Sequence, residues 1–273
     1  MDNPDTLINL EKFVSDKTVE ILKSNISIIR DDYDEASYLY PFWQNYPPDE
    51  RGRSPRGDQF PWIEVGEHVL GSILPRLLAK SFGIKDYGIP TGPDARFILK
   101  SNDIHCLTKG ITDSCWVFID IKSVGPRDDA KHAVMSHNQI SGDGKWAGLK
   151  KGIINSVINA KGKRVTHPFY CALPPLYISS KNEILPMIGM VIKPVYKMTM
   201  VGTQCIGQPL ERIDVVTIPN GILLFYGPKY LIKYPGLFFP GKDIKSKNPK
   251  KTRARVSFDL LMKIDQWRVQ TII

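Results

Sequence analysis

The sequence has few cysteines, no long apolar run and none of the compact motifs that mark several enzyme classes. Its four cysteines (Cys106, Cys115, Cys171 and Cys205) stand at least 9 positions apart, too far for the close pair of a zinc ribbon or a redox motif, so we expect free thiols. No apolar stretch approaches the ~18 residues of a membrane span, and the first residues are acidic where a signal peptide is basic. We therefore expect a protein of the reducing cytoplasm.

Several catalytic motifs are also missing. No HExxH occurs and the five histidines are scattered, which argues against a zinc enzyme. No GxSxG elbow is present, and the glycine-rich stretch at residues 142–148 has neither the spacing of a dinucleotide fingerprint nor a Walker lysine-threonine. These absences disfavour zinc enzymes, α/β-hydrolases and nucleotide-binding loops.

The composition is that of a globular protein, with 42% hydrophobic and 24% charged residues in a chain of 273. The formal net charge of +9 is unevenly distributed: residues 1–67 hold 7 Lys/Arg against 14 Asp/Glu, whereas residues 241–273 hold 9 against 3. A basic tail indicates a surface for a polyanion such as nucleic acid. Charge alone leaves open the alternative that these side chains only face solvent.

Hydrophobic periodicity predicts helices early in the chain and strands later. Helices are expected over residues 6–30 and 63–82, the second with a kink at Pro75. Strands are expected over residues 96–99, 115–122, 169–178, 187–198 and 222–226, with an irregular segment over 38–61. This order favours an α/β fold with a mixed β-sheet flanked by helices. No repeat or linker divides the chain, so we expect a single domain over residues 1–273.

The predicted strand at residues 115–122 carries an Asp-x-Lys arrangement. Residues i and i+2 of a strand share a face, so Asp120 and Lys122 should project together while the isoleucines between and before them face the core. Metal-assisted phosphodiester hydrolysis needs two acidic groups on a divalent cation and a lysine beside the attacking water. Asp94, just before an earlier predicted strand, is placed to supply the second carboxylate.

Taken as letters, these motifs are weak, because Asp-x-Lys occurs four times and Pro-Asp three times. Only Asp120 and Lys122 lie in a strand-like run, where burying both charges unpaired and without a use would cost several kcal/mol. The alternative is a structural ion pair. The residue pattern alone leaves both interpretations open.

Pro93-Asp94, followed 26 positions later by Asp120-Ile121-Lys122, resembles the PD-(D/E)xK motif of a nuclease superfamily. From about residue 30 to the end, further segments resemble a type II restriction endonuclease of that superfamily, in order and with similar spacing. These segments are residues 41–48, 61–67, 90–94, 120–128, 174–178, 219–221 and 240–243. The resemblance implies a restriction-endonuclease-like fold and an enzyme that cuts double-stranded DNA with Mg²⁺.

The resemblance also implies roles for individual residues. Three groups would hold Mg²⁺: Asp94, Asp120 and the backbone carbonyl of Ile121. Lys122 would position the attacking water, and Glu67 would be an outer acidic group, a role that Glu64 could share from three residues earlier on the helix. Ca²⁺ is expected to support DNA binding without cleavage, and the products should carry 5′-phosphate and 3′-hydroxyl ends.

The implied DNA site is an interrupted palindrome, GCC and GGC around five unspecified pairs, read by a homodimer because two-fold DNA matches a two-fold protein. Base reading is expected from residues whose types suit G and C: Arg127, Asp128, Lys242, Asp243, Arg253 and Arg255. Ile244 departs from the pattern, which has an acidic residue there, so relaxed or altered specificity is expected. A cognate DNA methyltransferase is expected in the same host, but not as a stable partner.

Two other functions stay open on the sequence. A structure-specific repair or junction nuclease would keep the metal carboxylates but recognise DNA shape, and discrete fragments from ordinary duplex DNA would exclude it. A non-catalytic DNA-binding module would keep the basic tail without the carboxylates, and cutting by the wild type would exclude it.

Overall fold

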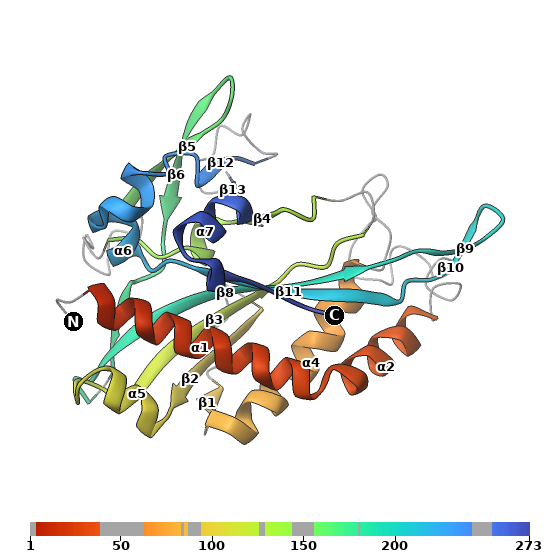
Figure 1. Ribbon diagram of the computed structural model, residues 1–273, viewed down its shortest axis with the longest axis horizontal. Coiled ribbons are helices and arrows are strands. Elements are labelled where there is room, and N and C mark those ends of the chain that lie inside the picture. The colour runs from red at the N-terminus through yellow and green to blue at the C-terminus, as the bar shows by residue number, and fades with distance from the viewer. Residues whose placement is uncertain are drawn as a thin grey trace.

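The computed structural model describes residues 4–38, 63–82, 85–86, 94–125, 129–143, 156–179, 181–241 and 253–273. Its centre is a seven-stranded mixed sheet (Figure 1). The order across the sheet is β1 (Lys85–Asp86), β2 (Ala95–Lys100), β3 (Ser114–Ile121), β8 (Ile184–Tyr196), β11 (Leu210–Ile218) and β14 (Val269–Ile272), with β7 (Leu176–Ile178) on β8. Only β3 and β8 run parallel, so the expected mixed sheet is confirmed.

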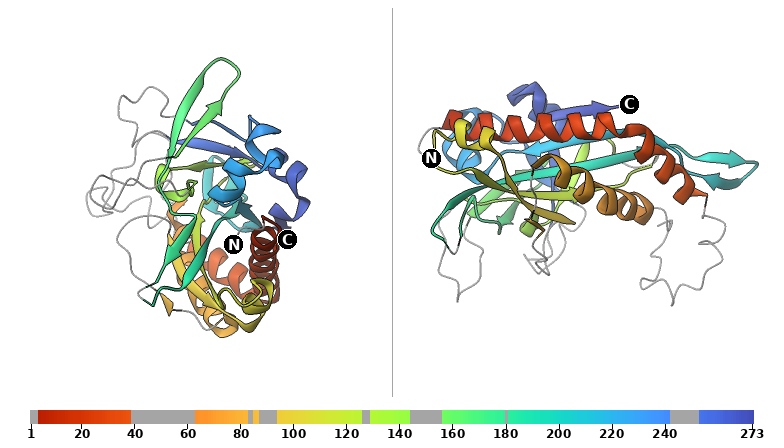
Figure 2. Two further views of the ribbon diagram at one scale, coloured as in Figure 1. Left: turned by 90° about the vertical axis from the view of Figure 1, so that its left-hand side faces the viewer. Right: turned by 90° about the horizontal axis from the view of Figure 1, so that it is seen from below.

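Helices cover one face of this sheet. α1 (Pro4–Ser24) contacts β8 and β11, α4 (Ile63–Phe82) contacts β2 and β3, and α2 (Ile26–Ser37) packs against α4. Figure 2 shows α1 running along one side of the sheet. The apolar stripe of α1 is fully buried at Leu10 and Val14, so burial against the sheet stabilises this helix more than its intrinsic propensity does.

The opposite side carries smaller elements. A three-stranded sheet has the order β12 (Phe238–Pro240), β13 (Ala254–Ser257) and β4 (His132–Met135). Beside it stand the hairpin of β5 (Ser156–Lys161) and β6 (Thr166–Cys171) and the helices α6 (Gly221–Tyr226) and α7 (Phe258–Ile264). The short α5 (Asn102–Leu107) precedes β3, and the hairpin of β9 (Thr199–Val201) and β10 (Gln204–Gly207) joins β8 to β11.

The two ends of the chain meet in a buried polar cluster. Arg268, after α7, donates to the Glu11 carboxylate of α1 at 2.8 Å and to the Tyr230 hydroxyl at 3.0 Å. The other Glu11 oxygen accepts from the Asn220 backbone N–H at 2.7 Å. Glu11 and Arg268 are both fully buried, so the pair persists only because each charge is matched by a partner.

Most of the predicted elements are present. The helix over 63–82 is α4, with Pro75 inside it, and the strands over 96–99, 115–122 and 187–198 correspond to β2, β3 and β8. The three cysteines whose side chains the structure describes, Cys106, Cys115 and Cys171, are free thiols. Among the described residues, no helix has both the length and the apolar character needed to cross a membrane.

Three predicted elements differ from the structure. The helix over 6–30 is two helices, because the chain leaves helical geometry at Asn25, whose side chain donates back to the Ile21 carbonyl. The strand over 222–226 is wrong: this run forms α6, which Asn220 caps by accepting from the Ile222 N–H. The strand over 169–178 is the end of β6 and, after a break, β7. The irregular segment at 38–61 lies almost wholly outside the described residues.

Candidate active site

Asp94 is brought to the end of β3 by the antiparallel pairing of β2 with β3. It immediately precedes β2, whose first residue, Ala95, lies opposite Ile119. The Asp94 carboxylate accepts a hydrogen bond from the Ile121 backbone N–H at 2.6 Å. Two residues that are 27 positions apart are therefore in direct contact, with the Asp94 carboxylate next to the residue that follows Asp120.

Asp120 and Lys122 project to the same side of β3, as strand alternation predicts. The Lys122 ammonium lies 2.8 Å from the Asp120 carboxylate. Asp120 is only 2% exposed, whereas the Lys122 side chain is about a third exposed, so the lysine reaches from solvent toward a buried acid. Ile121 faces the other way and packs near Gly71 of α4, which fixes the strand against the helical layer.

A glutamine that the sequence did not predict completes the surroundings of Asp120. Gln139 ends the 3₁₀ turn His137–Gln139 that follows β4. Its side-chain amide donates to one oxygen of Asp120, and its own carbonyl oxygen accepts from the Ser136 backbone N–H at 2.6 Å. Both oxygens of Asp120 are thus engaged, one by Gln139 and the other by Lys122.

The donor set suits a hard divalent cation. Asp94 and Asp120 offer carboxylate oxygens and Ile121 a backbone carbonyl, which are the ligand types that Mg²⁺ and Ca²⁺ prefer. The described residues contain no cluster of three or more His, Cys, Asp or Glu side chains, so a metal here would draw on two carboxylates, the main chain and other oxygens. Mg²⁺ commonly binds in this way, through one or two carboxylates with water and substrate phosphate.

Several predicted site residues lie outside the described part of the chain. Glu64 and Glu67 belong to the first turns of α4, but the structure does not describe their side chains. The predicted base-reading residues outside it are Arg127, Asp128, Lys242 and Asp243. Their roles stay predictions.

The structure does bring together the main-chain ends of the segment that carries Lys242 and Asp243. The Gly241 N–H donates to the Arg253 carbonyl at 2.9 Å, where β12 pairs with β13. A Cβ on Gly241 would lie 2.4 Å from that carbonyl oxygen, so only glycine allows this close approach. Arg253, at the far end of this segment, therefore lies directly beside Gly241.

Arg255 points toward Asp129, which follows the predicted base-reading residues Arg127 and Asp128 in the sequence. It lies on β13 opposite Val134 of β4, and its guanidinium is 3.7 Å from the carboxylate of Asp129, the first residue after the loop 126–128. Asp129 also accepts from His132 Nδ1 at 2.6 Å. Burial raises the pKa of Asp129, but the His132 contact and the charge of Lys193 outweigh it and hold this pKa below its usual value.

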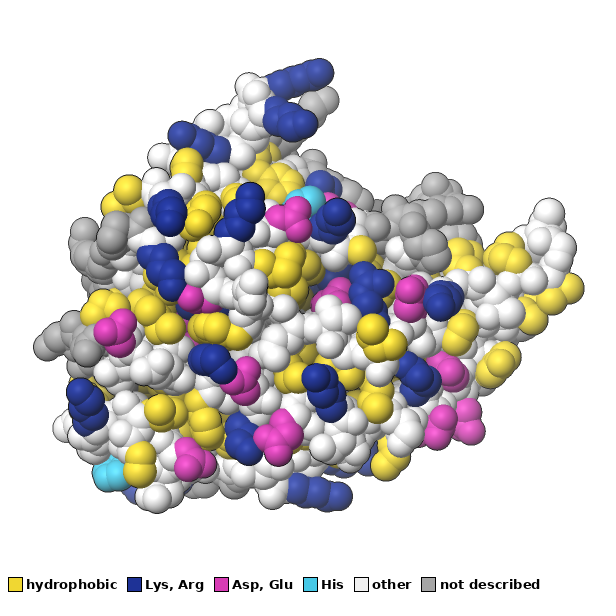
Figure 3. Space-filling model, in the orientation of Figure 1, with side chains coloured by type: hydrophobic (Ala, Val, Ile, Leu, Met, Phe, Trp, Pro, Cys, Tyr) yellow, Lys and Arg dark blue, Asp and Glu magenta, His cyan; other side chains and the backbone are white. Residues whose placement is uncertain are grey.

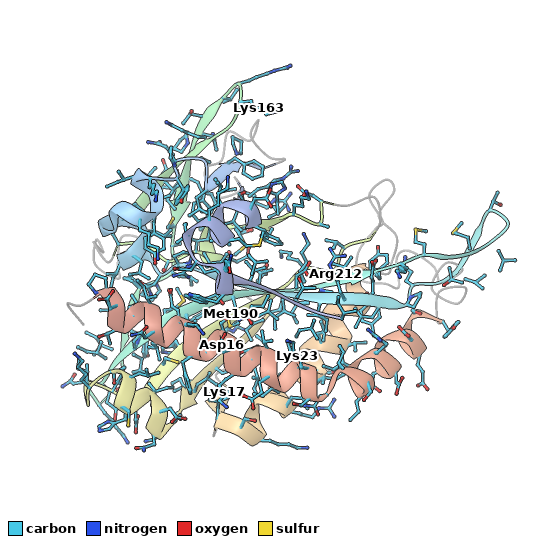
Figure 4. The ribbon with its side chains drawn as sticks, viewed as in Figure 1. Asp16, Lys17, Lys23, Lys163, Met190 and Arg212 are labelled. Carbon is cyan, nitrogen blue, oxygen red and sulfur yellow. The ribbon has the colours of Figure 1, made fainter. Side chains whose placement is uncertain are left out.

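A separate basic feature stands at the tip of the β5–β6 hairpin. Lys161, Lys163 and Arg164 are exposed there, and Figures 3 and 4 show cationic side chains extending from the top of the molecule, with Lys163 at the tip. The stem contacts β12, so the tip stands beside the β12–β13 strands that lead into the predicted base-reading segment.

Comparison with known proteins gives one consistent relationship. Residues 1–272 match the family model described as restriction endonuclease BglI. The type II restriction enzyme BglI of Bacillus subtilis is 44% identical over 275 residues, which cover 99% of this chain and 92% of that protein.

Solved structures agree with the sequence match. A crystal structure of the restriction endonuclease BglI bound to its DNA recognition sequence superposes with a TM-score of 0.89 at 44% identity, covering 99% of this chain and 92% of that one. Tetrameric restriction endonuclease SfiI bound to cognate DNA has a TM-score of 0.61 at 14% identity, covering 99% and 85%. The second likeness shows a shared fold alone.

Proposed function

Because this chain belongs to the BglI family of restriction endonucleases, we propose that it is a Mg²⁺-dependent enzyme that cuts double-stranded DNA at an interrupted, G/C-containing palindrome. One observation carries the proposal: the pairing of β2 with β3 brings Asp94 against Ile121 at the end of β3, beside the pair formed by Asp120 and Lys122. A non-catalytic DNA-binding module would have no need of two carboxylates and a lysine at one strand end.

The side chains divide the work of hydrolysis. Asp94, Asp120 and the Ile121 carbonyl would hold Mg²⁺, which when bound supplies a Lewis acid beside the scissile phosphate. Lys122, paired with Asp120 and reaching in from solvent, would orient the attacking water. In-line displacement of the 3′-oxygen then leaves a 5′-phosphate and a 3′-hydroxyl. Glu67, or Glu64 on the same helix, would act as an outer acidic group.

The substrate assignment follows from the family. The related BglI structure is bound to its DNA recognition sequence, and we propose that this chain likewise binds duplex DNA, as a homodimer whose two-fold axis matches a palindrome. The proposed readers of G and C are Arg127, Asp128, Lys242, Asp243, Arg253 and Arg255. As a restriction enzyme it would act in the cytoplasm, on DNA that a cognate methyltransferase has not protected, and as one nuclease domain.

Digestion of a sequenced plasmid with Mg²⁺, followed by mapping of the fragment ends, tests the function directly. Discrete fragments with 5′-phosphate ends are expected, whereas a repair or junction nuclease would leave ordinary duplex intact. Asp120→Asn and Lys122→Ala should each slow cleavage by several orders of magnitude but keep site-specific binding in Ca²⁺, because the base contacts lie elsewhere. Lys145→Ala, in another Asp-x-Lys, is the matched control. Near wild-type cutting by Asp120→Asn would refute the assignment.

A further inference from the structure

Gln139 holds the metal-site carboxylate from outside the PD-(D/E)xK motif. Its amide donates to Asp120, and its orientation is set because its carbonyl accepts from the Ser136 N–H at 2.6 Å. A side-chain amide fixed at both ends has little rotational freedom. Any shift of the turn His137–Gln139 would therefore change how Asp120 is presented to a metal ion.

This turn continues directly from β4, which is bonded to the strand that carries Arg255. β4 pairs antiparallel with β13, with Val134 opposite Arg255 and Met135 opposite Ala254. Met135 and Ala254 are both buried, so a shift of either strand would require the other to repack. If Arg255 shifts when it binds a base, β4 would therefore shift with it.

The other end of β4 is tied to the central sheet. The ammonium of Lys193, a fully buried residue of β8, donates to the backbone carbonyls of Asp129 and, at 2.5 Å, of His132. β8 is the strand bonded to β3, with Asp120 opposite Val191. Asp129 in turn contacts Arg255. Residues 129–139 are therefore attached to both predicted base-reading regions and, at their far end, to Asp120.

From this continuity we propose that residues 129–139 couple base reading to the metal site, with Gln139 as the positioning residue that acts on Asp120. The proposal rests on the proposed function, since it assumes that Arg255 and the loop 126–128 read bases. Correct contacts would set β4, and through it Gln139, so that Asp120 is placed for metal binding and hydrolysis. Wrong bases would leave Asp120 misplaced. Contiguity alone does not demonstrate coupling, so the test must measure an interaction energy.

The test is a double-mutant cycle, in which one change is Gln139→Met in the protein and the other is the replacement of one base pair in the DNA. Single-turnover cleavage rates are measured for wild type and variant, on the mapped site and on a site with one G·C pair replaced. The pair to replace is identified with the Arg255→Ala variant. It is the base pair whose replacement slows cleavage by the wild type but does not slow cleavage by Arg255→Ala. On the mapped site we expect Gln139→Met to lose about 10-fold or more in rate, the size expected for a lost hydrogen bond to a charged group. On the altered site the loss should be under about 3-fold, because the coupling is already broken there.

Equal losses on both sites would overturn the coupling and leave Gln139 as a local support of Asp120. Affinity for the mapped site in Ca²⁺ should stay unchanged, which separates a positioning role from weaker binding. Gln270→Met is the matched control, since Gln270 bonds Ser15 and Asp16 on the helical face, and it should cut both sites as wild type does.

A second variant keeps the proposal testable if Gln139→Met fails to fold. Asp129→Asn weakens the link to Arg255 without touching Asp120 or its partners, and it should lower the ratio of cleavage rates on the mapped and altered sites. An unchanged ratio would overturn the coupling. If the wild type cuts no duplex DNA with Mg²⁺, the proposed function falls and the coupling with it; if it cuts a defined site while the effects simply add, only the coupling falls.

Discussion

At the scale of single residues, the candidate site depends on a carboxylate that is almost completely buried. Lys122 and Gln139 both contact Asp120, and leaving a buried acid without such partners costs about 3–5 kcal/mol. The ion pair that the sequence offered as an alternative to a metal site is therefore present. The two interpretations are compatible, since a lysine that holds the carboxylate is also within reach of a water beside it.

The Asp129–His132 contact leads to a prediction about acid stability. A carboxyl whose folded pKa is lowered stabilises the fold fully above its unfolded value of 3.8, and this stabilisation is lost as the pH falls through the lower folded value. His132→Ala removes the His132 contact that lowers the Asp129 pKa while the burial that raises it remains, so this pKa should rise and acid unfolding should begin at a higher pH. The effect should stay below about 1 kcal/mol, because the Asp129 side chain is 38% exposed.

Circular dichroism between about pH 2 and 6, with carboxyl NMR to follow Asp129, measures this shift. His105→Ala is the control, because His105 is an exposed residue of α5, and its acid midpoint should match that of the wild type. An Asp129 pKa that stays low in His132→Ala would mean that Lys193 or Arg255, not His132, sets it.

Single residues also show what the sequence could and could not predict. Asp120 and Lys122 were predictable because a two-residue spacing on a strand fixes their common side. Asp94 was predictable only together with the strand that follows it. Gln139 was not, because its contact with Asp120 depends on how β4 and its turn fold back onto the sheet, and no local periodicity encodes that path.

At the scale of elements, long periodic segments were predicted well and short apolar ones were not. The 20-residue helix α4 has a single apolar stripe and a clear signal for its C-terminal end. The apolar run at 222–226 fits a strand or a helix equally well from its periodicity, and only the N-terminal cap formed by Asn220 makes it a helix. The break at Asn25 is a similar case. Periodicity continues across it, so only the side-chain bond from Asn25 to the Ile21 carbonyl shows where α1 ends.

The β5–β6 hairpin leads to a prediction about salt dependence. Replacing Lys161, Lys163 and Arg164 with alanine should weaken binding to all duplex sequences alike, because exposed cations beside the β12–β13 strands would contact phosphates. Each lost contact should reduce the slope of log affinity against log salt by about 0.9. Fluorescence anisotropy in Ca²⁺, at several salt concentrations, measures both quantities.

The matched control removes the same charge from the helical face. Lys12, Lys17 and Lys23 of α1 carry three cations on the opposite side of the sheet, and Figure 4 places Lys17 and Lys23 on that helix, far from Lys163. Their triple alanine variant should keep the wild-type slope. Equal slopes for the two triple variants would show that only net charge matters and that the hairpin makes no specific contact.

At the scale of the whole molecule, the pair of Glu11 and Arg268 joins the first helix to the last turn. Arg268→Met would leave Glu11 buried and uncompensated, and we expect a loss of about 3–5 kcal/mol in the free energy of unfolding. The double variant with Glu11→Leu should recover much of it, since no charge is then left buried. Urea unfolding measures all three proteins. Lys12→Met is the control, because both side chains of its pair with Asp16 are exposed, and this pair should contribute no more than about 1 kcal/mol.

The last prediction concerns how a two-fold assembly reads its site. In a homodimer on a palindrome, each base-reading residue acts once in each half-site, and a good bidentate contact is worth about 1–3 kcal/mol of discrimination. Ile244 cannot accept a hydrogen bond from cytosine, so preference should relax at one base pair per half-site relative to GCC and GGC. Ile244→Asp should partly restore this preference, whereas Ile244→Asn supplies an acceptor without the charge and should restore less.

Sequencing of cleavage ends from a randomised library measures the preference at every position. Wild-type ends that show strict GCC, five unspecified pairs and GGC would refute relaxation while leaving the nuclease assignment intact.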